Sequence, residues 1–398
     1  MSRSSAQFRL CAYAWWMVGS ERKTQTSVAI RLLTRAFLSL LLPFPPPTIQ
    51  NFSRRRPPRS VVIFVPSAGY SYTTRAMPVE VVTPKTVRAA IGELPAVAWP
   101  TVCLLLLCIL IEITTVSLLH VHLIPRWVAV GVNTAAIFAA FTPMHEASHS
   151  TVGLKKLKLL NPIVGWLSGS CFPMPFPAFR TMHLLHHKHT NESLDPDLWA
   201  GSGPVFLLPL KWLTIELKYY VWYIPSLPFR PYSETLPTVM YLLCMIFGLR
   251  YLLRSPFSDC VLYGWLLPGR LALSLLAYFF DYLPHRPHVV TGRTNQHHAT
   301  SVTTLYSSSV SSSSSSSSFL NDGFLTLPLL SQNYHNIHHL APYVPFYLYG
   351  RIWRRYKKEL IEAGTPVTPV FGFDRLKATR DAERVNRESA SAAASRKD

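Results

Sequence analysis

The sequence has few charged residues, and acidic residues are especially scarce. Of 398 residues, 15% are Asp, Glu, Lys or Arg and 49% are hydrophobic, with 20 acids against 39 bases. A soluble domain normally carries more charge, so this composition favours an integral membrane protein. The bases are spread over the first segment, the loops and the tail, and they form no basic stripe interleaved with aromatic residues. Nucleic-acid binding is therefore not expected.

The motifs of several cofactor sites and disulfide scaffolds are also missing. The six cysteines show no C-x-x-C spacing and mostly lie in or beside apolar runs, so neither a disulfide framework nor a zinc ribbon is indicated. The sequence has no glycine-rich dinucleotide fingerprint and no cytochrome b5 haem motif. Any redox reaction of this chain therefore needs a separate protein as its reductant.

Long apolar runs predict an all-α integral membrane protein with about four transmembrane helices. The runs cover residues 99–124, 127–144, 236–253 and 260–283, and a bilayer is crossed by about 20 apolar residues. They form two hairpins, so the chain returns to its starting side after the second and fourth spans. Lysine and arginine are enriched on that side, which agrees with this topology. A weaker run at 161–176, with three prolines and two glycines, is expected to be re-entrant or interfacial.

The segments that flank the spans have biased compositions. Residues 1–79 contain eleven Lys or Arg and one acid, Glu21, which predicts a disordered transit segment over about the first 80 residues and a plastid membrane as the destination. Eleven of the twelve residues at 307–318 are serine, which indicates a flexible low-complexity loop. Residues 365–398 are predicted to be a charged, disordered tail, which leaves 81–364 as the membrane domain.

Histidines recur in clusters with helical spacing. Residues three and four apart share one face of a helix, so each H-x-x-H-H motif presents three imidazoles together. Two such motifs, one H-x-x-x-H pair and one histidine at the end of the fourth span supply nine candidate metal ligands: His145, His149, His183, His186, His187, His285, His335, His338 and His339. All are expected on one side of the membrane. Zinc takes four ligands, whereas two octahedral irons accept nine imidazoles, so two irons are predicted.

Two other hypotheses for the function of these histidines remain open, a zinc peptidase and a metal transporter. His145-Glu146-Ala147-Ser148-His149 matches H-E-x-x-H, which provides two ligands and a general base in zinc peptidases. A peptidase needs only one further ligand, however, and leaves both H-x-x-H-H motifs unexplained. A histidine-lined metal transporter is the alternative that is not an enzyme, and it predicts ligands within the spans rather than at their ends.

The three histidine motifs together resemble those of the membrane fatty-acid desaturase and hydroxylase superfamily. Within that superfamily, four local sequences look like those of the cyanobacterial-type β-carotene hydroxylases: His145-Glu146-Ala147-Ser148-His149, Asp195-Pro196-Asp197, the run Phe279-Phe280-Asp281-Tyr282-Leu283-Pro284-His285-Arg286-Pro287, and Gln332-Asn333-Tyr334-His335. The resemblance covers about residues 99–364. Glu146 stands where that family usually has Asp, and the serine tract is a further departure.

The resemblance implies four spans under a helical cap on the cytosolic or stromal side, a di-iron centre, O2 as co-substrate and hydroxylation of the β-ionone ring of β-carotene at C3. It implies that His285 completes the ligand set and that Asp281 holds an iron directly or through water. Asp195 and Asp197 are expected to hydrogen-bond a ligand histidine. Acyl-lipid desaturases and carotenoid ketolases share these ligands and remain alternatives. The apolar substrate would enter from the lipid bilayer, and ferredoxin is the expected electron donor.

The remaining histidines and a basic segment lie outside these motifs. Four histidines on the same side of the membrane are expected to be solvated, and two near the opposite surface are expected to be uninvolved: His189, His288, His297 and His298 in the first set, His120 and His122 in the second. Residues 349–361 are basic and amphipathic, which predicts a helix on the membrane surface or a docking site for an acidic electron-transfer partner.

Overall fold

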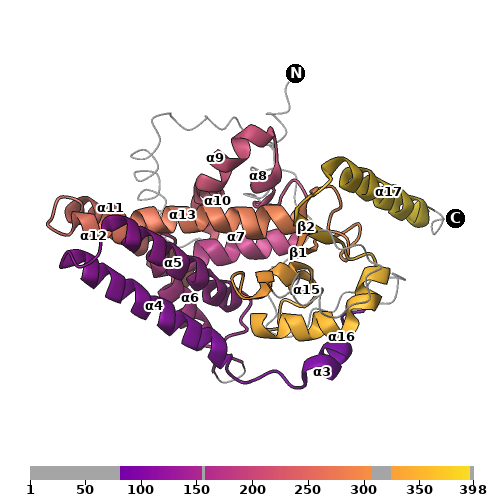
Figure 1. Ribbon diagram of the computed structural model, residues 1–398, viewed down its shortest axis with the longest axis horizontal. Helices are drawn as coiled ribbons and strands as arrows, with labels where there is room; N and C mark the ends of the chain where they lie inside the picture. Colours follow the sequence, from indigo (N-terminus) through magenta and orange to yellow (C-terminus); the bar gives the residue numbers. More distant parts are fainter. Residues whose placement is uncertain (1–80, 155–156, 307–323, 395–398) are drawn as a thin grey trace, which may run out of the picture. The chain divides into compact units, whose positions relative to one another are not determined.

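The structure is a computed structural model that describes residues 81–154, 157–306 and 324–394 (Figure 1). The predicted transit segment and the serine tract lie outside the described residues. The described part of the chain is mostly helical, and only two short strands accompany the helices. The prediction of a helical membrane protein is therefore confirmed.

Among the described residues, four helices are long and apolar enough to cross a membrane, as predicted. They are α4 (Trp99–His120), α5 (Arg126–Ser148), α11 (Tyr232–Leu252) and one continuous helical run, Ser258–His285. That run comprises α12 (Ser258–Val261), the π-helical turn η4 (Leu262–Leu266), α13 (Leu267–Leu276), the π-helical turn η5 (Ala277–Tyr282) and the 3-10 turn η6 (Leu283–His285). In α4 the only Asp, Glu, Lys or Arg is Glu112, and Pro100 fits the first turn because its missing N–H has no helical partner there.

The C-terminal ends of α5 and of the fourth span lie on the same side of the membrane domain. α4 and α5 form an antiparallel hairpin, and α13 and α6 pack against α5 (Figure 1). At one end, the Arg126 guanidinium donates to the carboxylate of Asp259 over 2.6 Å, which ties the start of α5 to the start of the fourth span. Both helices run away from this ion pair. The opposite ends, Ser148 and His285, therefore reach the same membrane face.

A helical hairpin occupies the position of the predicted re-entrant segment. α6 (Leu160–Cys171) and α7 (Phe176–Lys188) are each shorter than about 20 Å, so neither can cross a bilayer about 30 Å thick. A Cβ atom at Gly165 would overlap the ring of Phe176, so the close approach of the two helices requires glycine there.

Aromatic side chains satisfy the backbone carbonyls of the turn between α6 and α7. The donors come from three different helices, and the bonds are Trp265 Nε1 to Ser170 (3.2 Å) and Cys171 (3.0 Å), Tyr241 Oη to Phe172 (3.1 Å) and Tyr220 Oη to Pro173 (2.8 Å). Carbonyl groups buried at membrane depth need such partners because lipid offers none. These bonds explain how a non-helical turn is tolerated beside the spans.

The remaining described elements connect the spans or build a cap on the side of Ser148 and His285. The connecting elements are α8 (Leu198–Gly201), η2 (Val205–Leu207), α9 (Leu208–Leu213), α10 (Ile215–Tyr223) and η3 (Ile224–Phe229), and the cap elements are α3 (Pro84–Ile91), β1 (Val302–Tyr306), η7 (Gln332–Tyr334), α15 (His335–Leu340), η8 (Phe346–Leu348), α16 (Tyr349–Glu362), β2 (Val367–Phe371) and α17 (Arg375–Ala394). Val221–Pro237 falls in a separate compact unit. Within it, Arg230 Nη1 donates to Glu234 over 2.8 Å, and the guanidinium lies 4.8 Å from the centre of the Tyr223 ring.

The disordered tail predicted for 365–398 is wrong for the described residues. β2 pairs in parallel with β1, with Val302 opposite Val367, and α17 forms a 20-residue helix. Ala382 of α17 is fully buried, and Asn386 donates to the carbonyl of Val289 over 3.2 Å. These partners lie 65 or more residues away along the chain, so the local composition could not reveal them.

Candidate metal centre

The nine predicted ligands come from four places that the fold brings together. His145 lies in the last turn of α5, and His149 is the residue that ends the helix. His285 ends the fourth span in η6. The two H-x-x-H-H motifs lie in the last turns of α7 and in α15, both of which are helical as their spacing predicted.

The nine histidines form two groups whose ligand atoms lie within 4.8 Å of one another. The first group is His145, His149, His183, His187 and His338, and the second group is His186, His285, His335 and His339. Each H-x-x-H-H motif is divided between the groups. In α7 the i and i+4 residues join the first group and the i+3 residue joins the second, whereas in α15 the assignment is reversed.

Spacing between the Nε2 atoms fits octahedral coordination. In the first group the separations are 2.8 Å for His149 and His183, 3.2 Å for His183 and His187, and 2.8 Å for His187 and His338. In the second group they are 3.2 Å for His186 and His339, 3.0 Å for His335 and His339, and 3.0 Å for His285 and His335. Metal–nitrogen bonds of about 2.1 Å place neighbouring ligands about 3.0 Å apart at right angles and about 3.4 Å apart in a tetrahedron. The five imidazoles of the first group and the four of the second would therefore suit two octahedral ions, and such ions would each have room for a further ligand.

Partners on the outer ring nitrogens hold several rings with their Nε2 atoms facing inward. His285 Nδ1 lies 3.3 Å from Asn191 Oδ1, and Asn191 Nδ2 donates to the carbonyls of Val290 (2.8 Å) and Ala299 (2.7 Å). Because Nδ2 is already committed as a donor, Oδ1 must accept from His285 Nδ1–H. The Nε2 atom of His285 is left with a free lone pair, which is the form that binds a metal.

Two further rings are held in the same way. His338 Nδ1 lies 2.9 Å from the hydroxyl of Tyr349, and His186 Nδ1 lies 2.9 Å from a carboxylate oxygen of Asp195. The second carboxylate, that of Asp197, is 3.4 Å from the same nitrogen. The hydrogen bond expected between these acids and a ligand histidine is therefore present.

Burial and neighbouring charges control the protonation of the rings outside the spans. Burial, reinforced by the surrounding imidazoles, lowers the pKa well below the ordinary value for His149, His183, His187, His335, His338 and His339. At His186 burial also acts to lower the pKa, but the carboxylates of Asp195 and Asp197 outweigh it and raise the pKa to about 9. Most of the rings are thus neutral and available as ligands.

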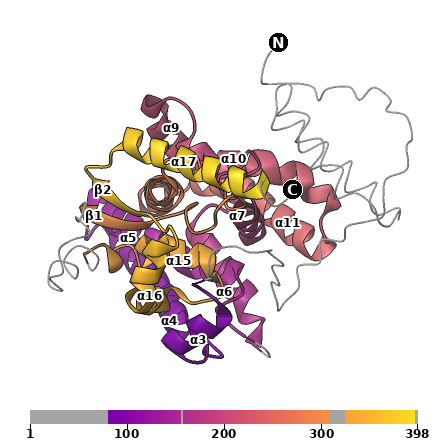
Figure 2. The same ribbon diagram turned by 90° about the vertical axis from the view of Figure 1, so that its right-hand side faces the viewer.

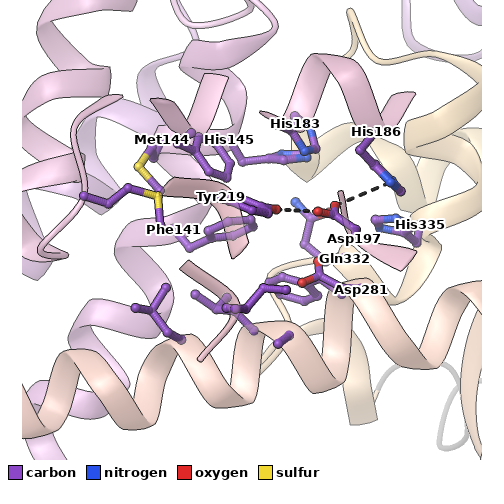
Figure 3. A pocket seen from close by; sticks show the side chains of 17 residues that line it. Phe141, Met144, His145, His183, His186, Asp197, Tyr219, Asp281, Gln332 and His335 are labelled. Carbon is purple, nitrogen blue, oxygen red and sulfur yellow. Dashed lines mark hydrogen bonds and ion pairs between the residues drawn. The ribbon is translucent and has the colours of Figure 1, made fainter. Parts of the chain in front are cut away.

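A narrow pocket lies directly beside the histidines (Figure 3). Its polar end contains His145, His183, His186, His335 and Asp281, and its remaining walls are mainly apolar. The apolar lining comes from α5, the turn between α6 and α7, α7, α10 and the fourth span, and comprises Phe141, Met144, Met174, Phe179, Ile215, Leu273, Leu276, Ala277 and Phe280. None of the described lining residues is Lys or Arg.

Asp281 lies in the π-helical turn η5, one turn before His285. It lines the pocket and joins neither histidine group, so its role as an iron ligand stays a prediction. Figure 3 places it near Gln332 and Asp197. π-Helical turns often occur at functional sites because the extra residue redirects neighbouring side chains.

Glu146 does not have the position that a peptidase base would need. Its carboxylate is buried and accepts hydrogen bonds from the hydroxyl of Thr101 and the backbone N–H of Phe346. It therefore links α5 to α4 and to the cap. The metal-transporter hypothesis also loses support, because only two of the nine candidate ligands, His145 and His285, belong to spans, and both lie at span ends.

The histidines outside the nine differ from expectation in part. His189 is buried, at 7% exposure, and its Nδ1 atom lies 2.8 Å from Glu192, so the prediction of a solvated side chain is wrong. His288 is half-buried and stacks on His285 with ring centres 6.2 Å apart, and burial lowers its pKa to about 4. His297 and His298 are also half-buried rather than solvated. His120 stacks on Phe257 at the opposite end of the spans, as expected.

Sequence reasoning missed the residues that support the ligands. Asn191 and Tyr349 hold ligand rings, and Tyr219 donates to Asp197 Oδ1 over 2.5 Å. Asn191 lies two residues after an off-motif histidine, which is a weak local signal. Tyr349 and Tyr219 lie 11 and 22 residues from their partners, and no spacing rule connects them.

The fold and the site define a helical membrane protein whose two histidine groups are compatible with a di-iron centre. The sequence profile of the fatty acid desaturase family matches residues 122–371. This match covers more than half of the chain and includes all nine histidines. The chain belongs to the fatty acid desaturase family. A search of curated proteins finds no match.

Proposed function

We propose that this protein is a di-iron, O2-dependent membrane oxygenase that hydroxylates the β-ionone ring of β-carotene at C3, toward zeaxanthin. The observation that carries the proposal is the mainly apolar pocket, with no Lys or Arg among its described lining residues, that ends at the two histidine groups. A bound iron pair would supply O2 activation, with two external electrons and two protons, so that one oxygen atom enters a C–H bond and the other leaves as water.

The proposed ligands are all nine histidines, five in the first group and four in the second. Asp195 and Asn191 fix the tautomers of His186 and His285, so their Nε2 lone pairs face the metal positions. Phe141, Phe179 and Phe280 pack around the pocket and exclude water from the reacting carbon. Asp281 is proposed to act from the pocket wall, through water or directly.

The lining of the pocket supports a hydrocarbon substrate. A carboxylate, phosphate or thioester-linked carrier would need a cation or several donors, and the described lining contains no Lys or Arg. The walls from α13 and η5 belong to a membrane span, so entry from the bilayer requires no aqueous path. Segments that resemble β-carotene hydroxylases supply Asp281 and Gln332 to the same pocket, which favours a carotenoid ring over an acyl chain.

The test is expression of the full chain in bacteria that accumulate β-carotene. We expect cryptoxanthin and zeaxanthin, identified by chromatography and mass spectrometry against an empty vector. His338→Ala should abolish both products and lower the iron content, because it removes a ligand of the first group. Ketolated pigment, or unchanged pigment with new double bonds in the host's fatty acids, would refute ring hydroxylation in favour of ketolation or acyl-lipid desaturation.

A further inference from the structure

Helix α16 presents a line of exposed arginines and one lysine on the cap. Arg351, Arg354 and Arg355 are exposed, and their i, i+3 and i+4 spacing places them on one face. Lys358 is also exposed but follows the non-helical residue Tyr356. The three arginines are called the arginine face below. No ion pair of the three arginines is found among the described residues, and Lys358 reaches only Glu362, at 3.9 Å. The face therefore carries uncompensated positive charge.

The opposite, apolar face of α16 is already occupied. Ile352, Trp353 and Leu360 are almost completely buried in a cluster that includes Tyr334 and Ile337. α3 and α15 pack beside α16 (Figure 2). A helix that lies on a bilayer must bury its apolar face among the lipids. The apolar face of α16 is buried against the rest of the cap, so the prediction that residues 349–361 lie as a helix on the membrane surface is wrong.

Helix α16, which carries the arginine face, contacts the first histidine group through Tyr349. Tyr349 begins α16 and is almost completely buried, and its hydroxyl contacts His338 Nδ1 at 2.9 Å. Trp353 follows one turn later and packs against Tyr334, with ring centres 6.3 Å apart. One layer of buried aromatic side chains thus separates the exposed arginines from a metal ligand. Electron transfer slows steeply with distance, so a reductant docked here would have a short path.

We infer that the arginine face of α16 is the docking surface for an acidic, one-electron carrier protein that reduces the metal centre through His338. The inference rests on the proposed function, since each hydroxylation consumes two electrons and the chain has no reductase motif. Two reduced carriers are oxidised in each cycle, and their electrons and two protons reduce one oxygen atom of O2 to water. Charge complementarity favours an acidic partner and accelerates its encounter.

The test uses the full-length protein in nanodiscs, with plant-type ferredoxin as the probe. The variant R351E/R354E/R355E reverses the face, and K377E/R380E/R387E makes the same charge change on exposed residues of α17. We expect the first variant to raise the KM and Kd for ferredoxin at least about tenfold and to flatten their dependence on salt. Its turnover with a small-molecule reductant should equal that of the wild type. The α17 variant should retain the wild-type KM.

Three outcomes would overturn the inference. An unchanged KM in the α16 variant would refute the docking surface while leaving the proposed function intact. A loss confined to discs with anionic phosphatidylglycerol, and absent in neutral phosphatidylcholine, would assign the face to lipid headgroups instead. If the wild type hydroxylates no carotenoid with either reductant, the proposed function fails and the inference fails with it.

Discussion

The division of each histidine motif between two groups predicts that one metal can be weakened without the other. Asp195 offers the most specific test, because its side chain is 1% exposed and its carboxylate contacts His186, a member of the second group. The carboxylate lies 2.9 Å from His186 Nδ1 and accepts from the backbone N–H groups of Asn191 (2.7 Å) and Asp197 (2.9 Å). Asp195→Asn keeps the volume but removes the charge and turns one acceptor into a donor.

The contacts of Asp195 indicate how much Asp195→Asn should weaken metal binding at the second group. The side-chain amide nitrogen introduced by Asp195→Asn would face the backbone N–H of Asn191, and a buried donor without an acceptor costs about 1–3 kcal/mol. His186 Nδ1 keeps only a neutral amide oxygen in place of a carboxylate oxygen, and changes to such a partner of a ligand histidine lower metal affinity by about 10- to 100-fold. Only the second group contains His186. The variant should therefore lose one iron at a chelator concentration at which the wild type keeps both.

The assay is iron per chain after dialysis against graded chelator, read together with the Mössbauer spectrum of iron-57-loaded protein. Glu192→Gln is the matched control, since Glu192 contacts His189 and Arg293 and neither belongs to a histidine group. It should retain both irons. Simultaneous loss of both irons from Asp195→Asn, or loss of neither, would refute the assignment of His186 to a separate second group.

Three further predictions follow from the pocket, the turn and the buried glutamate. Leu273→Trp should fill the pocket and remove hydroxylation with iron retained, whereas Leu271→Trp, on an exposed position of the same helix, should leave product yield unchanged. Trp265→Phe removes a donor from the turn between α6 and α7 and should lower the free energy of unfolding in detergent by about 1 kcal/mol, while an unaltered unfolding curve would contradict the role of that bond. Glu146→Gln should retain iron and turnover in the pigment assay, because the side chain is a structural acceptor, and complete loss of turnover with iron still bound would instead support a catalytic base.

Features determined by short stretches of sequence were predictable. The spans depend on the length and polarity of continuous runs, so all four were found with end errors of a few residues. The nine clustered histidines were recognisable because helical spacing places i, i+3 and i+4 side chains on one face. The common side of the membrane followed from the number of crossings, and the ion pair of Arg126 with Asp259 has the geometry that this topology requires.

Only the tertiary structure determined which histidines lie in the same group and which residues hydrogen-bond to them. The orientation of α7 against α15 assigns His186 and His187 to different groups, although they are neighbours in the chain. The partners Asn191 and Tyr349 reach their histidines through folding, and Glu146 turns away from the site because Thr101 and the Phe346 N–H bind it. Local sequence specifies helices and apolar faces through short-range geometry. Which faces meet, and therefore which polar atoms converge, depends on packing between segments far apart in the chain.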